Sequence, residues 1–489
     1  MKTLRFFALI LSILCCNIAV WAAPLQFSQV LHSHFLGTAA LNSLTLQVDM
    51  RQLDADQAEA LLDARFNASL GWSDELAPTT SPFAATGSSL GFASGQWVQP
   101  LVNGSTLTAK LNYNRAELSY PSSVSPAFQS SINPIYQHQI DLIYRYPLWQ
   151  GAGNAGYTSQ KGAAKHEKTA AIWRISMLKE QLASQGLALY FQYVLHDLSL
   201  SLADDAMVRA KKLLSYQRKR EQLGLIEKAD RLQADALLAT RSLQHVQALG
   251  AVQRGQTALN RFMFQAEDNA FELALTPIGF ALEDVESAFV QAQKQRPVFA
   301  MLQAQYAAAE TRLTYAQQAD LQQLDIVGQV GSRALDGDAG AALGQGFSLA
   351  DRYIGLRLEF SDTSRHTASR VAIQKSVLAM ENINIERRKY AENIKTDLLN
   401  IYALLRSSQA TLKASKAQVR AEKAKFKAEM RRYREGRSNT ATMTQFEGEL
   451  RAAELRWAME KVALLQSSYQ LALVKGELWT KIGMLGSAL

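Results

Sequence analysis

Few residues in this chain have the types and spacing that catalysis or metal binding requires. The seven histidines occur singly, apart from His32 and His34, and none has the spacing typical of metal ligands. His245 falls within a helical pattern, where a packed or hydrated side chain is more common than a ligand. No arrangement of serine, histidine and acid predicts nucleophilic catalysis. We therefore expect no enzymatic activity, no metal and no cofactor.

One glycine cluster matches a nucleotide-binding motif. Gly151, Gly153 and Gly156 follow the G-x-G-x-x-G pattern between a predicted strand and a predicted helix. The preceding strand alternates apolar and polar residues, however, whereas a strand buried in a parallel sheet is apolar throughout. No second strand with an acidic residue follows at the expected length. We interpret the cluster as a flexible joint, and a soluble dinucleotide-binding enzyme as the weakest alternative function.

A row of basic side chains, which we call the basic stripe, is the sharpest charged pattern. Its members recur at helical spacing: Lys413, Lys416, Arg420, Lys423 and Lys427. The ordinary interpretation is a hydrated helix face. The functional alternative is a surface that meets an acidic partner or an anionic solute. We do not interpret the net charge of +8 as a sign of nucleic-acid binding.

Charged and polar residues also gather beside two glycine turns. The first turn is Leu223-Gly224-Leu225, and Asp230 lies just past it. The second is Glu435-Gly436-Arg437, with Tyr433 beside it. If the two turns converge at one end of a tube, opposite charges there could close it by ion pairs, although surface pairs are usually weak.

The turns belong to a unit that occurs twice. A shift of 212 positions (436 − 224) lays Gly224 on Gly436 and Arg145 on Arg357. One offset that serves strands and helical turns indicates a duplicated strand–helix–helix unit. We expect an N-terminal repeat over 23–276 and a C-terminal repeat over 277–489.

Each repeat is predicted to contain a helix, two strands and a long helical hairpin. In the N-terminal repeat the helix covers about 27–66, a loop rich in Ser, Thr, Gly and Pro covers 67–95, and the strands cover about 98–113 and 139–148. The hairpin covers 149–264. The corresponding elements of the C-terminal repeat are a helix at about 281–320, strands at about 324–332 and 351–361, and a hairpin at 363–483. A glycine-rich loop over 331–346 joins the last two strands.

The long helices carry coiled-coil patterns. Apolar residues recur every seventh position in the last helix: Met443, Leu450, Trp457, Leu464, Leu471 and Leu478. A second seam consists of alanine alone: Ala410, Ala414, Ala417, Ala421, Ala424 and Ala428. The first helix of each hairpin has roughly 65–70 residues, which corresponds to about 100 Å. A tube or a spacer needs helices of that length, and a globular core does not.

The predicted strands have one apolar face and one polar face. Leu142, Tyr144 and Tyr146 alternate with Asp141 and Arg145. Strands of about 9–11 residues with this pattern fit a transmembrane barrel, and a soluble sheet with one wet face is the alternative. Four strands cannot close a barrel, because about eight is the smallest common number. Since open edges are not tolerated in lipid, several chains would have to share one barrel.

The start of the chain reads as a secretory signal peptide over 1–22. Lys2 and Arg5 precede an apolar run, and small residues precede Pro24. Both cysteines lie in this segment, so we expect a mature chain without disulfides. No other stretch approaches a transmembrane helix in length and apolarity.

These features resemble the TolC-like outer membrane efflux protein family. The matching motifs are Tyr146-Pro147-Leu148-Trp149-x-Gly151 and Tyr433-x-x-Gly436-Arg437-Ser438, and the resemblance extends from about Val48 to Leu478. It implies an α+β, mainly α fold, in which a homotrimer forms a twelve-stranded transmembrane β-barrel on a long α-helical periplasmic barrel. The implied function is a passive outer membrane channel of a multidrug efflux or type I protein secretion system. The implied partners are a periplasmic adaptor, an inner-membrane transporter and outer membrane lipid, with no nucleic acid.

The resemblance also implies where the channel would be gated. Asp230 and Tyr433 match gate positions at the two turns, whereas Arg437 lies one residue from the expected place, which Ser438 occupies. Gln445 stands where a carboxylate is expected, and we include it as a gate candidate. The implied docking residues for the adaptor are Gly224, Leu225, Gly436 and Ser438. The alternative function is a periplasmic coiled-coil adaptor, which usually carries a single hairpin.

Overall fold

The computed structural model describes residues 25–76, 84–267, 269, 272, 276–348 and 351–483. The predicted signal peptide therefore lies outside the described residues. The chain divides into two compact units. The first comprises Met1–Thr45, Trp173–Ala300 and Arg387–Leu489, and the second comprises Leu46–Ile172 and Met301–Glu386.

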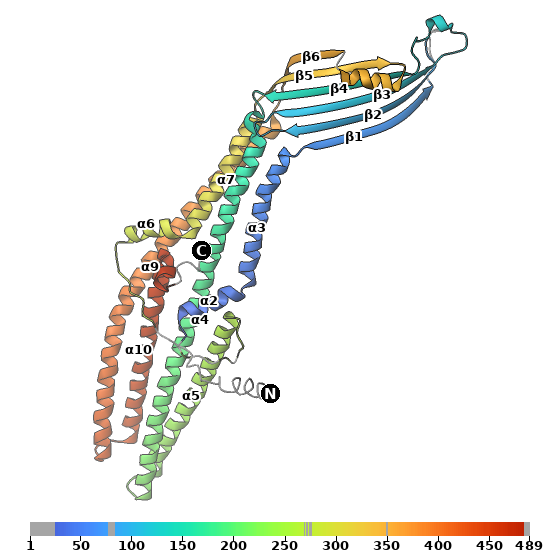
Figure 1. Ribbon diagram of the computed structural model, residues 1–489. Helices are drawn as coiled ribbons and strands as arrows, with labels where there is room; N and C mark the ends of the chain where they lie inside the picture. Colours follow the sequence, from blue (N-terminus) through green and yellow to red (C-terminus); the bar gives the residue numbers. More distant parts are fainter. Residues whose placement is uncertain are drawn as a thin grey trace, which may run out of the picture. The chain divides into compact units, whose positions relative to one another are not determined.

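The second unit is built on one antiparallel sheet whose strands follow the order of the sequence (Figure 1). The strands are β1 (Arg65–Leu76), β2 (Gly87–Pro100), β3 (Thr106–Ser119), β4 (Ile135–Pro147), β5 (Gln323–Asp336) and β6 (Arg352–Ser361). Every neighbouring pair is antiparallel, and β1 and β6 form the two edges.

The described residues thus form six strands, and the expectation of four was wrong. The segment 67–95, which we expected to be a loop, contains most of β1 and the start of β2. Its many small residues suit a strand here because they leave room for aromatic side chains. Gly71 lies opposite Phe92, and a Cβ atom at Gly71 would collide with the Phe92 ring. Backbone pairing along the whole of β1 offsets the low strand propensity of glycine.

The glycine-rich loop over 331–346 was also predicted incorrectly. β5 continues to Asp336, and the helix α8 (Ala339–Ser348) follows it. α8 lies against β4 and β5, and Gly346 of α8 is packed on the ring of His138. A Cβ atom at Gly346 would overlap that ring, so the glycine permits the close approach.

The register gives the sheet two chemically different faces. One face carries exposed apolar side chains on all six strands: Phe66, Leu70, Trp72, Trp97, Leu111, Leu142, Tyr144, Ile326, Val330, Ile354, Leu356, Leu358 and Phe360. The opposite face carries polar and charged side chains: Lys110, Asn112, Asp141, Arg145, Gln329, Arg333, Tyr353, Arg357 and Glu359. The predicted alternation in β3 to β6 is confirmed, and β1 extends it, whereas β2 carries Leu90 and Phe92 on the polar face.

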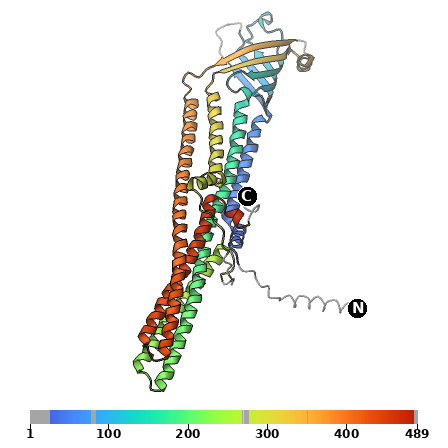
Figure 2. The same cartoon turned by 90° about the vertical axis from the view of Figure 1, so that its left-hand side faces the viewer.

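Two helical hairpins dominate the first unit (Figures 1 and 2). α4 (Ala155–Gln222) is followed by α5 (Lys228–Phe262), and α9 (Thr367–Arg434) by α10 (Thr440–Lys475). α4 and α9 each contain 68 residues, while α5 and α10 contain 35 and 36. No helix in the described ranges is both long enough and apolar enough to cross a membrane.

Shorter helices complete the structure. α2 (Phe27–Gly37), α3 (Ala39–Glu59) and the 3-10 turn η1 (Ala60–Leu62) precede β1, in place of one helix over 27–66. The 3-10 turns η2 (Pro126–Phe128) and η3 (Ala152–Asn154) flank β4. α6 (Val285–Gln295) and α7 (Pro297–Ala319) precede β5, and α11 (Leu478–Lys481) follows α10.

The core of the first unit joins α2 to both hairpins. Phe27 of α2 packs edge-on against Tyr469 of α10, with ring centroids 5.5 Å apart. Tyr190 and Phe191 of α4 complete the aromatic group, and Leu259 of α5 is fully buried beside them. Burying aromatic side chains contributes much of the apolar area in such a core, so this cluster fixes α2 against the hairpins.

Both hairpins turn through the same backbone motif. Gly224 and Gly436 have φ angles of 69° and 75°, in the left-handed region that glycine adopts without strain. In the first turn, the amide of Leu225 donates to the carbonyl of Arg220 at 2.9 Å. In the second, the amide of Arg437 donates to the carbonyl of Arg432 at 2.8 Å. Each glycine is thus the left-handed residue that ends the first helix of its hairpin.

Candidate functional site

A polar cluster, which we call the turn cluster, lies beside the two glycine turns. Each of the four long helices contributes one member: Gln217 from α4, Asp230 from α5, Tyr433 from α9 and Thr440 from α10. The Thr440 hydroxyl donates to Asp230 Oδ1 at 2.8 Å and lies 3.1 Å from the Tyr433 hydroxyl. Gln217 Nε2 donates to both Tyr433 and Thr440. The cluster therefore connects the first hairpin to the second at their turns.

The aromatic member of the turn cluster is almost completely enclosed. Tyr433 is 1% exposed, and this burial raises the pKa of its hydroxyl. The Arg220 guanidinium lies 5.9 Å from the Tyr433 ring centroid, and the Tyr216 ring packs at 5.6 Å. The hydroxyl is therefore a neutral hydrogen-bonding group at physiological pH.

The local sequence explains why Gln217 is buried. On α4 it continues an apolar stripe at spacings of three and four residues: Ala203, Ala206, Ala210 and Leu213. The same stripe packs against Leu237 of α5 and Met443 of α10. A polar residue within such a stripe must find partners inside the protein. This polar interruption of the apolar stripe could have indicated from the sequence that Gln217 is buried and hydrogen-bonded, whereas no comparable pattern marks Thr440.

The structure separates the four gate candidates. Asp230 and Tyr433 both belong to the turn cluster, where Thr440 bridges them. Arg437 is exposed and pairs with Glu435 of the same turn. Gln445 is also exposed and donates to Glu449 at 2.8 Å. Arg437 and Gln445 therefore lie outside the cluster.

The docking candidates differ in accessibility. Gly224, Leu225 and Gly436 are exposed at the tips of the turns. The Ser438 hydroxyl is buried and has no hydrogen-bond partner in the described part of the chain. All five residues of the basic stripe are exposed on α9.

A buried ion-pair network lies further along the hairpins. Glu447 of α10 accepts from Arg241 Nε of α5 at 2.8 Å and from Arg209 Nε of α4 at 3.3 Å. Arg209 also donates to Glu454 at 3.0 Å. Glu447 is 2% exposed, so the network joins three helices through a carboxylate that is almost completely enclosed.

The polar face of the sheet holds a second group of paired charges. Arg145 of β4 contacts Asp325 of β5 and Glu359 of β6, each at 2.7 Å. Asp141 of β4 and Tyr353 of β6 also meet across β5, over Gly331. These contacts require Gly331, because a Cβ atom there would lie 2.7 Å from both Asp141 Oδ1 and Tyr353 Cζ.

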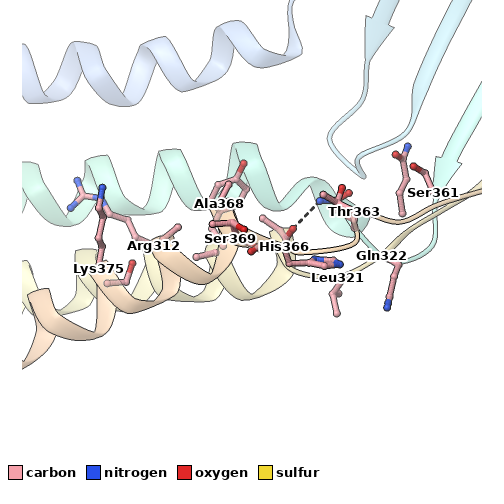
Figure 3. Close-up of a pocket in the computed structure, with 17 residues that line it drawn as sticks. Arg312, Leu321, Gln322, Ser361, Thr363, His366, Ala368, Ser369 and Lys375 are labelled. Carbon is pink, nitrogen blue, oxygen red and sulfur yellow. Dashed lines mark hydrogen bonds between the residues drawn. The ribbon is translucent and has the colours of Figure 1, made fainter.

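A cavity of about 660 Å³ lies in the second unit, between the end of α7 and the start of α9 (Figure 3). Its polar lining includes Arg312, His366 and Lys375. His366 contacts Asp362 at 2.8 Å, and Arg312 pairs with Glu167. Two of these three side chains therefore already have partners within the chain. Among the described side chains, no group of His, Cys, Asp and Glu is arranged to hold a metal ion.

No protein-family model matches the chain, and no curated protein sequence matches it. Solved structures do match. The outer-membrane channel OprN is 15% identical with a TM-score of 0.63, and the match covers 93% of this chain and 90% of that one. The Neisseria gonorrhoeae MtrE outer membrane channel, solved in its open state, is 13% identical with a TM-score of 0.62, covering 92% and 89%.

The Vibrio cholerae outer membrane protein VceC is similar to the same extent. It is 13% identical with a TM-score of 0.61, and the match covers 94% of this chain and 96% of that one. These matches span nearly the whole of each protein. The chain therefore has the fold of these outer membrane channel structures.

Proposed function

We propose that this chain is the outer membrane channel subunit of an export system, with a large periplasmic part. The observation that carries the proposal is the sheet, which exposes apolar side chains on one face and paired charges on the other. A sheet with this division suits lipid on one side and water on the other. The fold shared with OprN, MtrE and VceC supports the same conclusion.

The two sheet edges support a channel built from several copies. In lipid, the unpaired backbone groups of β1 and β6 would each cost several kcal/mol. β6 of one copy can pair with β1 of the next in antiparallel orientation, because six strands of alternating direction leave edges that run oppositely. A homotrimer closed in this way has eighteen strands rather than twelve. Barrels of about this size enclose an aqueous channel.

We further propose that the turn cluster restricts the periplasmic end of this channel. Asp230 and Tyr433 are held together by Thr440, so they tie the two hairpins together at their turns. Opening would require the hairpins to separate and these hydrogen bonds to break. In this proposal the exposed turn residues, including Leu225 and Gly436, dock a periplasmic adaptor, which would connect the channel to an inner-membrane transporter.

Membrane fractionation and an unheated denaturing gel test the channel itself. The channel predicts an outer membrane protein that migrates as a heat-dissociable trimer. A soluble periplasmic monomer would refute the proposal and favour a coiled-coil adaptor instead.

Conductance in a planar bilayer tests the gate. The double variant Asp230→Ala, Tyr433→Phe should conduct several-fold better than the parent channel, because it loses the bonds of Gln217 to Tyr433 and of Thr440 to Asp230, and only the bond of Gln217 to Thr440 still joins the hairpins in the turn cluster. Arg437→Ala is the matched control, since Arg437 lies at the same turn but outside the cluster. Equal conductance in the double variant and the parent would show that the cluster closes nothing.

A further inference from the structure

A cavity of about 370 Å³ lies between α4 and α5, close to the first glycine turn. Three of its lining residues are basic: Lys211, Arg218 and Lys219. The others are Leu214, Ser215, Gln222 and Leu238. All of them belong to the first unit. None of these described lining residues is acidic, so the cavity concentrates positive charge.

The sequence places the basic and polar lining on one face of α4. These residues follow spacings of four, three and four positions: Lys211, Ser215, Arg218 and Gln222. Residues at such spacings lie on the same side of a helix. Leu214, which is buried, and Leu238 of α5 supply the apolar part of the lining. The cavity is therefore a charged helix face that meets an apolar neighbour.

Two acidic residues close to the cavity are held by Arg231 of α5. Arg231 Nε lies 2.8 Å from Glu221, and its Nη1 lies 2.5 Å from Asp235. Arg218 reaches Asp235 only at 3.4 Å. Within the residues that the structure describes, Lys211 and Lys219 form no ion pair. The cavity therefore retains positive charge that the chain does not neutralise.

The helix dipole does not account for this grouping. Cations near the end of a helix offset the negative end of its dipole, and the effect is confined to the last turn. The last turn of α4 contains Lys219 and Arg220. Lys211 lies 11 residues before the end of the helix at Gln222 (222 − 211), or about three turns. Basic residues on one helix face also repel one another, which an anion between them would relieve.

The second hairpin adds positive charge beside the cavity. The Tyr216 hydroxyl of α4 donates to the carbonyl of Arg434 at 3.4 Å, so the ends of α4 and α9 lie together. The last turn of α9 carries Arg431, Arg432 and Arg434. Charges of one sign that gather in this way raise the local concentration of anions.

The separation of the basic side chains indicates which anion fits. Lys211 and Arg218 are seven residues apart (218 − 211), or about 10 Å along the helix. A single phosphate group is shorter than this separation, whereas an anion with two phosphate groups can contact a basic side chain at each end. Lysine binds phosphate as a point charge, and arginine can donate two parallel hydrogen bonds to it.

We propose that this cavity binds a soluble anion that carries two phosphate groups, such as diphosphate or a diphosphate ester. Lys211 and Lys219 hold the phosphate groups by charge, and Arg218 donates hydrogen bonds to them. Gln222 is placed to donate its side-chain amide as well. The site goes beyond the proposed function, which assigns no solute to the chain. In an export channel it would stand at the periplasmic end.

Isothermal titration calorimetry of the purified full-length protein with pyrophosphate tests the site. The parent protein should show saturable binding that weakens as the salt concentration rises, because the contact is electrostatic. The double variant Lys211→Gln, Lys219→Gln should bind about tenfold more weakly. Both side chains are exposed, so the fold should be kept, and circular dichroism checks this.

Two further variants separate a site from general charge attraction. Lys413→Gln, Lys416→Gln is the matched control, because it removes the same charge from the exposed basic stripe. Its affinity should stay within about twofold of the parent, since salt screens charges that do not contact the anion. Lys211→Arg, Lys219→Arg keeps both charges and should keep the binding.

Several outcomes would overturn the inference. They are a parent protein without saturable binding, an equal loss of affinity in the matched control, and orthophosphate that binds as tightly as pyrophosphate. Binding to phosphatidylglycerol vesicles in place of pyrophosphate would assign the cavity to a lipid headgroup and overturn the soluble ligand.

The binding assay is independent of the channel assays. An outer membrane trimer that binds no pyrophosphate overturns this inference and leaves the proposed function intact. A soluble protein whose pyrophosphate binding depends on Lys211 and Lys219 refutes the channel and leaves the site intact.

Discussion

The buried Glu447 network gives a quantitative prediction about how the hairpins are joined. The perturbation is Glu447→Met, which removes the carboxylate and keeps much of the side-chain volume. Arg209 would retain Glu454, at 3.0 Å. Arg241 would retain only the side-chain oxygen of Gln244, at 2.9 Å, among the contacts described. The uncompensated group is therefore the guanidinium of Arg241, whose side chain is 9% exposed.

The magnitude follows from that burial. Leaving a buried charge without its partner costs about 3–5 kcal/mol, whereas replacing both partners by apolar groups is often neutral or stabilising. Glu447→Met should lower the free energy of unfolding of the first unit by about 3–5 kcal/mol. The double variant Arg241→Met, Glu447→Met should recover most of that loss. The losses of stability caused by Glu447→Met and by Arg241→Met alone are then far from additive, as expected of side chains in contact.

The assay is urea unfolding of the purified, detergent-solubilised protein, followed by the helical circular dichroism signal. A matched control is the pair of Lys161 and Glu59, which has the same 2.8 Å contact distance but lies on the surface. Glu59→Met should leave the unfolding midpoint unchanged, because water screens exposed pairs. A loss below about 1 kcal/mol for Glu447→Met, or additive losses in the double variant, would refute the reasoning.

Two further predictions concern a buried acid and a glycine of the sheet. Glu180 lies 3.1 Å from Arg296, yet burial raises its pKa to about 7. The folded chain then holds a proton that the unfolded chain releases, so stability falls as the pH rises from about 4.5 to about 7. Glu180→Gln should abolish this fall in thermal midpoint and raise stability at pH 8 by up to about 3 kcal/mol. An unchanged pH profile would contradict the assignment. Gly331→Val should lower the thermal midpoint because it displaces Tyr353, whereas Gly328→Val on the same strand meets open space and should not. Equal midpoints for the two variants would contradict the close approach over Gly331.

The helical part of the fold could be predicted because its signals are local. A proline-free stretch from Trp149 to Thr276 with apolar residues at helical spacing predicts long helices. Gly224 and Gly436 mark the ends of two of them. Capping and periodicity depend on residues that are close in sequence, so they can be read without knowing the tertiary structure.

The sheet was predicted only where composition agreed with pattern. β1 alternates as clearly as β3 does, with Phe66, Leu70 and Trp72 on one face, but its serines, its glycine and the Ser, Thr and Pro residues that follow in the sequence suggested a loop throughout. What makes it a strand is the ladder with β2, which spans the whole of β1. Strand formation depends on a partner, so small residues that fit an aromatic neighbour weaken the sequence signal without weakening the strand.

The turn cluster shows the same division between local and tertiary information. Asp230 and Tyr433 could be proposed from their places beside the turns. Gln217 and Thr440 could not be assigned to the same site, because the cluster forms only where four helices meet. Arg437 was proposed from its position alone, and its side chain instead pairs within its own turn.

The six strands also explain how the first half of the chain can be longer while the two edges of the sheet keep opposite directions. Arg145 of β4 and Arg357 of β6 lie in one row, each paired with Val327 of β5. β4 and β6 are therefore equivalent strands of the two halves. In the second half, the helix α7 and the single strand β5 precede β6. In the first half, the helix α3 and three strands, β1 to β3, precede β4. The difference is the β2–β3 pair. Two strands are the smallest addition that keeps β1 and β6 running oppositely. Under the proposed closure, identical copies therefore still pair edge to edge, and the added hairpin would change the circumference of the closed sheet without changing its closing contact.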